Sequence, residues 1–378
     1  MTPDTLIAVY PPLEPGSLLG RARRDAFPWS EPGLRLTHLG RGAAWLALEA
    51  LGLGKGDRVA MPAYHCGSEV EAAHLRGCEV AFYRVDAELR VDEDDMRRVA
   101  TESDLLYLIS DFGFPMPEAP PGVAVIEDAA HGLFSLDPAG RPVGSLGDAA
   151  VFCPRKSLGV PDGGAVLVRG GSPRSVARRP GAKAMLRSTV SLAAARAALS
   201  RIGPLRRAAS RLIGRASIGD AAAREGELTD VVIGEWGLAP EDMENAAGRP
   251  ARLTSALVRR ADPDRLRARR RHNYALLAGE LAELAPEPFR ALPPGTAPLY
   301  FPALARDRDR AIAALLEHGV RPLEVWPVPH PLLDRTRFAE LEPLRNGLLA
   351  LPVHQALSDL HMERVLDAAR AVLLEQRH

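Results

Sequence analysis

The chain has 378 residues, a formal net charge of zero and three cysteines. Its length allows a large domain and a smaller one, and its neutral charge gives no general reason to expect nucleic acid. An odd number of cysteines argues for a reducing compartment rather than a disulfide framework. No apolar run reaches membrane-spanning length and the N-terminus lacks the basic region of a signal peptide, so we expect a cytoplasmic protein.

The N-terminal part combines a proline-rich segment with a helix that begins at a glycine pair. Residues 1–35 show little periodicity and predict an arm over the body of the protein. The Gly40-Arg41-Gly42 turn then runs into an Ala/Leu-rich segment ending at Leu51. Glycines at a helix start let backbone N–H groups approach an anion, and the helix dipole favours its charge. A lone Gly-x-Gly is more often an ordinary turn, and its spacing fits neither the dinucleotide fingerprint nor the P-loop.

A continuous apolar run, Val123–Ile126, leads directly into Glu127 and Asp128, with His131 shortly after. Such a run is typical of a strand that is covered on both faces. In an open α/β sheet the ligand crevice lies beyond the carboxyl ends of the strands, so Asp128 falls where an acid contacts a ligand. The alternative is that Asp128 is a helix N-cap, since Ala-Ala-His follows it.

Lys156 is one of three lysines, against 45 arginines, and follows the short apolar run 149–152. An amine can form an imine, whereas a guanidinium stays protonated. The alternative is a chance surface lysine at a strand end in an arginine-rich chain. Because run 149–152 predicts a strand that Lys156 ends, next to the strand ending at Asp128, an amine and an acid would lie together. Pyridoxal phosphate needs this pair: the amine forms the Schiff base and the acid keeps the pyridine nitrogen protonated.

The segment 163–219 contains twelve basic residues and no acidic residue. Within it, 185–200 and 204–213 have helical periodicity with arginines on one side. We favour amphipathic helices whose basic face balances acidic neighbours or a partner subunit. The second interpretation is a basic rim that attracts a diphosphate-bearing substrate. The third, contact of residues 171–217 with an anionic membrane surface, is not favoured.

The C-terminal part reads as a small α/β domain. A charged helix is predicted within 251–282, strands at 300–304 and 348–352, and helices at 308–319 and 358–375. The predicted organisation is therefore an arm (1–35), a large cofactor-binding domain (36–250) that includes the basic helical segment 171–217, and a small domain (251–378).

Several motifs in the same order resemble the DegT/StrS sugar aminotransferase family, which consists of fold-type I pyridoxal phosphate enzymes. The resemblance covers roughly residues 36–170 and 250–378, and it rests on the segments 40–42, 51–59, 62–66, 125–131, 144–148, 156–168 and 351–359. It implies an α/β fold like that of aspartate aminotransferase, with a mixed, mostly parallel sheet in the large domain and a small C-terminal α/β domain.

The resemblance also implies roles for individual residues. Lys156 would bind the cofactor covalently and carry protons, and Asp128 would contact the pyridine nitrogen. Gly40, Arg41 and Gly42 stand at the family's phosphate-binding turn. The remaining candidates are His131 beside the ring oxygen, Cys153 near the phosphate, and Cys66 where an aromatic residue normally stacks on the ring, a role that His65 or Tyr64 could take.

Two further departures from the family pattern concern the same cofactor site. Val151 replaces the usual serine five residues before the lysine, and the Gly-Tyr-Asn motif that many members lend across the dimer is absent. No metal is predicted.

The activity implied by the resemblance is transamination by a homodimer with its site at the subunit interface. An amino acid, L-glutamate by expectation, would donate the amino group to a keto sugar nucleotide by a ping-pong mechanism, in polysaccharide or antibiotic biosynthesis. A lysine at 156 argues against the family's dehydratase branch. The alternatives are amination of a keto-cyclitol or another small keto metabolite, and a catalytically silent, cofactor-binding member that acts in regulation or assembly.

Overall fold

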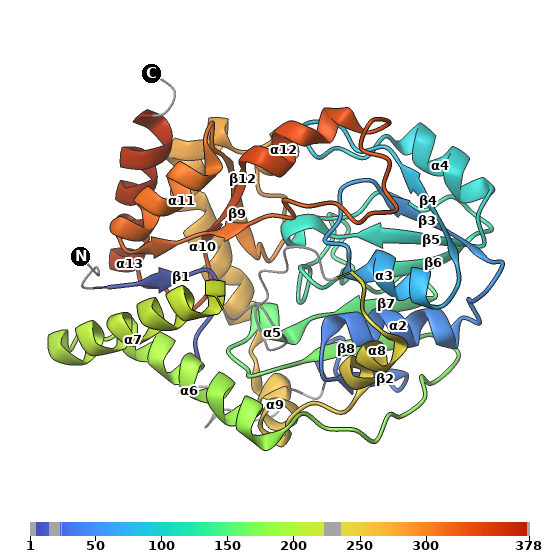
Figure 1. Ribbon diagram of the computed structural model, residues 1–378, viewed down its shortest axis with the longest axis horizontal. Helices are drawn as coiled ribbons and strands as arrows, with labels where there is room; N and C mark the ends of the chain where they lie inside the picture. The colour runs from blue at the N-terminus through green and yellow to red at the C-terminus, as the bar shows by residue number, and fades with distance from the viewer. Residues whose placement is uncertain (1–4, 15–22, 24, 223–235, 376–378) are drawn as a thin grey trace.

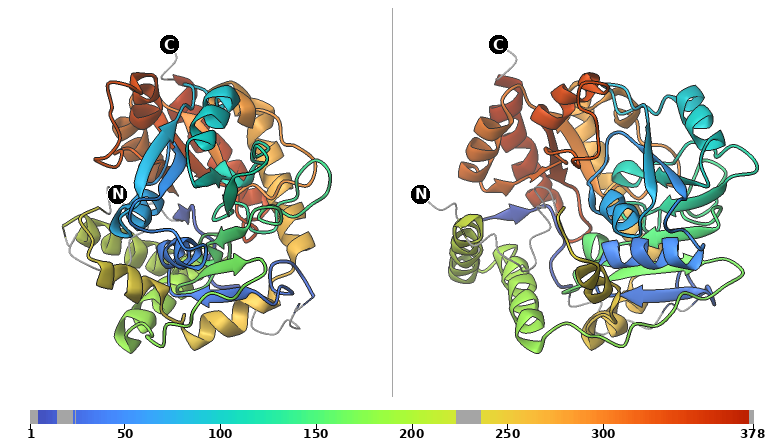
Figure 2. Two further views of the ribbon diagram at one scale, coloured as in Figure 1. Left: turned by 90° about the vertical axis from the view of Figure 1, so that its right-hand side faces the viewer. Right: turned by 45° about the vertical axis from the view of Figure 1, so that its right-hand side comes forward.

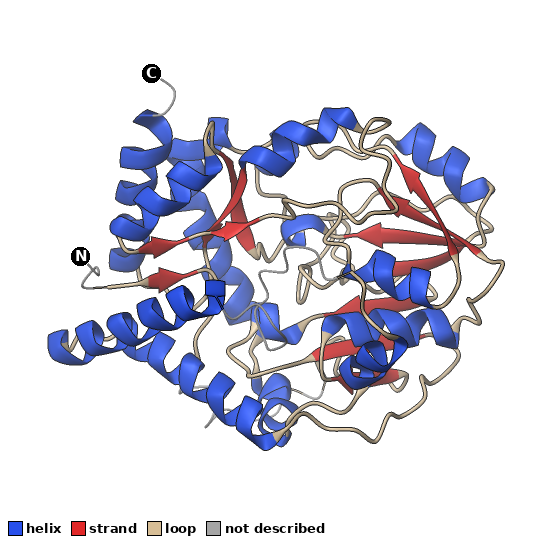
Figure 3. Ribbon diagram, viewed as in Figure 1, coloured by secondary structure: helices blue, strands red, loops and turns tan. Residues whose placement is uncertain are grey.

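The fold is organised around a seven-stranded sheet (Figures 1 and 3). The computed structural model describes residues 5–14, 23, 25–222 and 236–375. In spatial order the strands are β2 (Leu34–Thr37), β8 (Gly164–Val168), β7 (Ala149–Phe152), β6 (Ala124–Asp128), β5 (Leu105–Ile109), β3 (Arg58–Pro62) and β4 (Glu79–Tyr83). All neighbouring pairs are parallel except those that β8 makes with β2 and β7. The predicted mixed, mostly parallel α/β sheet is confirmed.

Helices cover both faces of this sheet. Alternate side chains of a strand point to opposite faces, so Val59 and Met61 on β3 belong to the core under helix α2 (Gly40–Ala50). Ala60 lies on the other face, in the cluster that includes Met96 of helix α4 (Glu93–Thr101). Helix α2 also packs against β7, β8, α3 (Ser68–Leu75) and α8 (Pro240–Ala247). The central strands are therefore buried on both sides, as their continuous apolar sequences predict.

A second, three-stranded antiparallel sheet forms the C-terminal part. Its order is β11 (Leu323–Glu324), β12 (Leu348–Pro352), β9 (Tyr300–Leu304), and the helices of this part of the chain are α9 (Arg252–Leu257), α10 (Pro263–Leu281), α11 (Arg308–Glu317), α12 (Glu342–Gly347) and α13 (Asp359–Ala369). Strand β1 (Ile7–Ala8) pairs with β10 (Val320–Arg321), which attaches the N-terminal arm to this part. The division of the chain at residues 35 and 250 stays a prediction.

The basic segment forms two antiparallel helices that project from the body beside β1 (Figures 1 and 2). They are α6 (Ala182–Ala198) and α7 (Gly203–Ala222), in agreement with the helical periodicity of the sequence. In the described part of the chain, no helix has the length and hydropathy needed to cross a bilayer.

The structure decides between the two interpretations of Asp128 and corrects the expectation for Lys156. Asp128 ends strand β6 and does not cap a helix, because the chain after it continues as a turn. Lys156 does not end a strand: β7 stops at Phe152, and Lys156 lies on a short helical turn, α5 (Pro154–Ser157). Pro154 explains this change, since it has no N–H for the strand ladder and suits the first helical position.

Candidate active site

A cavity of about 390 Å³ lies beyond the parallel strands β5, β6 and β7. Tyr107, Asp128 and Val151 reach it from these three strands, and Lys156 reaches it from α5. The other walls come from the arm, the start of α2, the turn before α3, the start of α6, α8 and the segment 323–327. The carboxyl ends of parallel strands are the usual place for a ligand in such a sheet.

Asp128 forms the acidic end of the cavity and is held on both carboxylate oxygens. The Tyr107 hydroxyl donates to Oδ2 at 2.8 Å, and the Ala130 N–H donates to Oδ1 at 2.8 Å. Burial, with a contribution from the Glu69 carboxylate, raises the pKa of Asp128 to about 6, against the lowering effect of these bonds and of Lys156. A buried carboxylate with a raised pKa gains a counter-charge when a protonated ring nitrogen lies beside it.

Lys156 lies 3.1 Å from His131, measured from Nζ to Nε2. The Phe112 N–H donates to Nδ1 of the same ring at 3.3 Å, and burial, together with the charge of Lys156, lowers the pKa of His131 well below its usual range. A neutral ring that accepts at Nδ1 carries its hydrogen on Nε2. That hydrogen points to the Lys156 amine, so the ring can orient the amine within the cavity.

Aromatic rings and strained backbone hold His131 in place. Its ring stacks on Trp326, with centroids 5.7 Å apart, and on Phe112, with centroids 6.1 Å apart. Both neighbours have a positive φ, 42° for Trp326 and 53° for Phe112, a conformation that bulky residues rarely adopt. Such backbone strain is typical of functional sites, where the surrounding structure maintains it.

Two arginines, Arg41 and Arg155, line the cavity together with the N-terminal turn of α2. No side chain caps this helix end, so its free N–H groups and dipole favour an anion. Burial, and then the Arg155 guanidinium, lower the pKa of Arg41, so an anion between the two groups would relieve their repulsion. A Cβ built on Gly40 would lie 3.4 Å from Cys153 Sγ, which shows how tightly the two segments approach.

His38 adds a titratable group to this end of the cavity. Its Nδ1 lies 2.8 Å from Oδ2 of Asp162, a fully buried carboxylate. Asp162 also accepts hydrogen bonds from the Ala251 N–H at 2.9 Å and from the Thr254 hydroxyl. These hydrogen bonds fix the position of Asp162, which in turn orients the His38 ring in the cavity wall.

Cys66 contacts a buried carboxylate rather than a ring. Its thiol donates to Glu69 at 2.8 Å, its N–H donates to the same carboxylate at 3.1 Å, and burial followed by the charge of Glu69 raises the pKa of the thiol. This cysteine lies in the cavity wall, at the position where the resemblance implies an aromatic residue. Tyr10, Phe112, Tyr300 and Trp326 are the aromatic side chains that line the cavity besides Tyr107.

Most of the predicted site residues meet in this cavity. Seven of them line it: Gly40, Arg41, Cys66, Asp128, His131, Cys153 and Lys156. Gly42 and His65 lie outside the lining. A Cβ on Gly42 would meet the Ala246 backbone at 2.1 Å, so this glycine allows α2 and α8 to pack. The His65 ring is fully buried and stacks on Phe82, with centroids 5.3 Å apart.

Sequence analysis did not identify several of the residues that line the cavity. Tyr10, Glu69, Tyr107, Arg155 and Trp326 come from five separate segments, and none carries a motif of its own. Only Arg155 had a usable signal, because it is adjacent to Lys156. The partners of the others depend on the tertiary fold.

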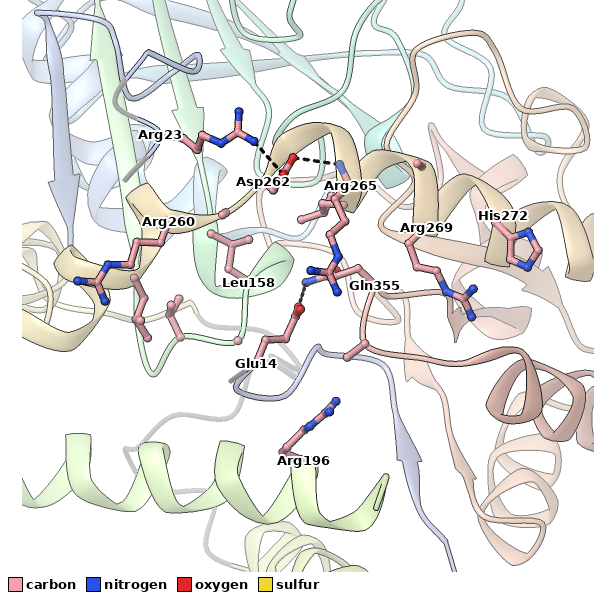
Figure 4. Close-up of a pocket in the computed structure, with 17 residues that line it drawn as sticks. Glu14, Arg23, Leu158, Arg196, Arg260, Asp262, Arg265, Arg269, His272 and Gln355 are labelled. Atoms are coloured by element: carbon pink, nitrogen blue, oxygen red, sulfur yellow. Dashed lines mark hydrogen bonds and ion pairs between the residues drawn. The ribbon is translucent and has the colours of Figure 1, made fainter. Parts of the chain in front are cut away.

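A second, larger cleft of about 1100 Å³ lies between α6, the arm and α10, and is shown in Figure 4. It is rich in arginine, but several of its charges are already paired: Arg23 with Asp262 at 3.0 Å and Arg269 with Asp359 at 2.8 Å. Gln355 donates to Glu14 at 2.7 Å across the same cleft. The described residues that line the cleft include no lysine or cysteine, so the smaller cavity is the better candidate for covalent chemistry.

The donor set of the smaller cavity fits pyridoxal phosphate. It offers a lysine amine, a carboxylate for the ring nitrogen, and guanidinium groups with a helix N-terminus for the phosphate. A sequence profile of the DegT/DnrJ/EryC1/StrS aminotransferase family matches residues 117–187, the segment that contains both Asp128 and Lys156. That segment is similar to this family. No curated protein sequence matches the chain.

Solved structures of the same fold extend over most of the chain. DesV from S. venezuelae, crystallised in complex with a ketimine intermediate, is 21% identical with a TM-score of 0.58, over 89% of this chain and 84% of that one. The sugar aminotransferase CalS13 from Micromonospora echinospora is 17% identical with a TM-score of 0.59, over 98% and 100%. NtdA from Bacillus subtilis, with bound cofactor PMP, is 16% identical with a TM-score of 0.55, over 90% and 73%.

At these identities the structural likeness establishes the fold, and the family assignment rests on the profile match. The predicted family, fold class, aminotransferase class and pyridoxal phosphate cofactor are confirmed. The roles of single residues, the donor and the acceptor stay predictions.

Proposed function

We propose that the protein transfers the amino group of L-glutamate to a keto sugar nucleotide by a ping-pong mechanism. One observation carries the proposal: Asp128 and Lys156 line the same cavity. Asp128 comes from the end of strand β6, and Lys156 comes from the turn after the adjacent parallel strand β7. The resemblance and the family match support the aminotransferase reaction. The sugar acceptor is supported by the resemblance and by CalS13, which is described as a sugar aminotransferase.

We assign the following roles to the residues of the cavity. Pyridoxal phosphate, when bound, supplies an electron sink that stabilises negative charge on the carbon that loses its proton. Lys156 would hold the cofactor and afterwards move the proton between the reacting carbon atoms. Asp128, fixed by Tyr107 and Ala130, would keep a proton on the ring nitrogen. His131 would orient the Lys156 amine through its Nε2 hydrogen.

Arg41 and Arg155 provide the positive charge that the reaction needs. Sequence analysis cannot select a donor-binding arginine among 45, but only these two line the cavity among the described residues. Together with the start of α2 we assign them to the cofactor phosphate and the carboxylate of the amino donor. Cys153 and Gly40 would allow the phosphate to approach the helix closely.

The dimer and the acceptor complete the proposal. We propose a homodimer whose partner subunit supplies the remaining walls of the site, as the resemblance implies. A keto-cyclitol or another small keto metabolite is the alternative acceptor, and a silent, cofactor-binding member is the alternative from another class.

Single-turnover spectroscopy of the purified protein tests the function. L-Glutamate should convert the cofactor to its amine form, with loss of the visible absorbance and release of 2-oxoglutarate. A keto sugar nucleotide should then restore the absorbance, whereas a keto-cyclitol should not. If the keto-cyclitol restores the absorbance and the keto sugar nucleotide does not, the acceptor is a keto-cyclitol instead. If no amino acid changes the cofactor spectrum, the silent, cofactor-binding member is favoured.

A further inference from the structure

Helices α6 and α7 form a hairpin, part of which packs against the body of the protein. We define this hairpin by residues 182–213. Its inner side is fixed by Ala198, Ala209 and Ile213, which cluster with Leu6 of the arm, and the Ser210 hydroxyl accepts a hydrogen bond from the Leu6 N–H at 3.2 Å. The other side of the hairpin faces away from the sheet (Figures 1 and 2).

The hairpin exposes several large aliphatic side chains. Among the described residues, nine large hydrophobic side chains are exposed, and five of them are on this hairpin: Leu186 (67%), Ile202 (62%), Leu212 (54%), Val190 (50%) and Leu205 (47%). Leu186 and Val190 are four residues apart, and Leu205 and Leu212 are seven apart, so each pair lies on one helix face.

Basic side chains flank these apolar stripes. Residues 182–213 contain seven basic residues and no acidic residue, although the whole chain is neutral. Arg201, Arg207 and Arg211 are exposed beside Leu205 and Leu212. On the neighbouring side, Arg196 extends from α6 into the cleft that contains the arginines of α10 (Figure 4). The surface therefore combines positive charge with protruding aliphatic groups.

These features select an anionic lipid surface as the occupant. A second copy that docked here in a two-fold arrangement would place the same basic surface against itself, at a cost in repulsion. Nucleic acid would match the charge, but residues 171–222 contain no aromatic side chain to stack on bases and the leucines would gain nothing. Lipid headgroups match the arginines, while aliphatic side chains of an amphipathic helix enter the boundary of the acyl chains.

We propose that the hairpin docks the protein reversibly on an anionic membrane surface, with the leucines inserted and the arginines among the headgroups. This proposal does not depend on the transamination reaction. It is compatible with the lack of a spanning helix in the described part of the chain, because the hairpin would lie along the membrane surface.

Co-sedimentation of the full-length holoenzyme with vesicles tests the proposal. The protein should bind vesicles of phosphatidylcholine with phosphatidylglycerol, and much less to phosphatidylcholine alone. Replacing Arg201, Arg207 and Arg211 with Gln should lower the partition coefficient roughly 100-fold, since each basic residue near an anionic surface contributes about fivefold. A matched control replaces Arg90, Arg97 and Arg335, which are exposed outside the hairpin, and should bind normally.

The apolar contribution is tested separately. Leu186→Gln with Leu212→Gln should also weaken vesicle binding, whereas Leu276→Gln with Leu332→Gln, two exposed leucines elsewhere, should not. Circular dichroism and the cofactor spectrum verify that each variant is folded. Equal binding to both vesicle types, or normal binding by both hairpin variants, would overturn the proposal. If the wild type does not bind vesicles and the hairpin variants lose the dimer in light scattering, the occupant is a second copy instead.

Discussion

The cavity around Lys156 and the hairpin of α6 and α7 use charge in opposite ways. In the cavity, carboxylates and cationic groups are buried and face one another across a short distance, with defined hydrogen bonds such as Tyr107 to Asp128. In the hairpin, all charges have one sign and lie at the surface beside exposed leucines. The buried arrangement can direct a reaction at single atoms, whereas the exposed one can only attract a partner of opposite charge.

This contrast also separates the expected effects of mutation and salt. Buried charges interact through a medium of low dielectric constant, so removal of one group changes a rate or an affinity strongly. Exposed charges are screened by salt and act collectively. The predictions below test this difference, beginning with the largest effect.

Asp128→Asn should reduce the rate of the glutamate half-reaction by a factor of about 10³ or more, because the neutral amide cannot hold a proton on the ring nitrogen. Cofactor binding should survive, since the amide has a similar shape. Stopped-flow absorbance with glutamate measures the rate. A rate within about tenfold of the wild type would mean that another group protonates the ring.

Arg41→Met and Arg155→Met should each weaken the binding of pyridoxal phosphate by roughly 10- to 100-fold, since each removes a charge-assisted contact. Binding of pyridoxal, which has no phosphate, should change much less. Fluorescence titration of the cofactor-free protein with both compounds measures the difference. Arg335→Met, at an exposed arginine paired with Glu342, is the control. Equal losses for both compounds would place the arginine away from the phosphate.

Acid should destabilise the protein through its buried neutral histidines. Burial lowers the pKa of His354 to about 3, while its ring donates to Ala8 O at 3.2 Å and accepts from the Ala356 N–H at 3.3 Å. The unfolded state binds the proton near pH 6.5, so stability is complete above that pH and decreases as the pH falls toward 3.

For His354 alone the loss between pH 7 and pH 5 is about 2 kcal/mol. Burial also lowers the pKa of His65 and His131, so the whole protein should show a larger effect. Urea unfolding at several pH values measures the free energy, and His354→Gln should reduce its pH dependence. An unchanged pH dependence in this variant would show that the ring is charged or exposed.

Salt should affect the hairpin and the cavity differently, and of the changes tested here it should alter catalysis least. Raising the salt concentration from roughly 0.05 to 0.5 M should release the protein from anionic vesicles, because the Debye length falls severalfold. The glutamate half-reaction should change by less than about twofold, since its charges are buried. Strong salt inhibition of the half-reaction would mean that the cavity is more open than its buried side chains indicate.

The sequence predicted the parts of the site that depend on local patterns. The apolar run before Asp128 indicated a buried strand, and its neighbour 149–152 placed Lys156 close by. The turn at Gly40 predicted the helix start that now faces the cavity. These features are encoded by contiguous residues, so periodicity and glycine position suffice to find them.

Other parts could not be predicted because they depend on distant segments. The contact of His131 with Trp326 joins residues that are 195 positions apart, and Tyr10 reaches the cavity only because β1 pairs with β10. Sequence spacing at Cys66 suggested a ring-stacking residue nearby, but the αL conformation of Gly67 and the hydrogen bonds to Glu69 give this turn its own geometry. The helical periodicity of 185–213 was correct, yet it could not reveal that the leucines face outward.

The central claim is that Lys156 holds the cofactor beside Asp128. Borohydride reduction of the purified holoenzyme, followed by peptide mapping, tests it most directly. The account predicts a stable cofactor adduct on the peptide that contains Lys156, and its absence in Lys156→Ala, while Lys55→Ala and Lys183→Ala keep it. An adduct on another lysine, or unchanged labelling of Lys156→Ala, would contradict the account.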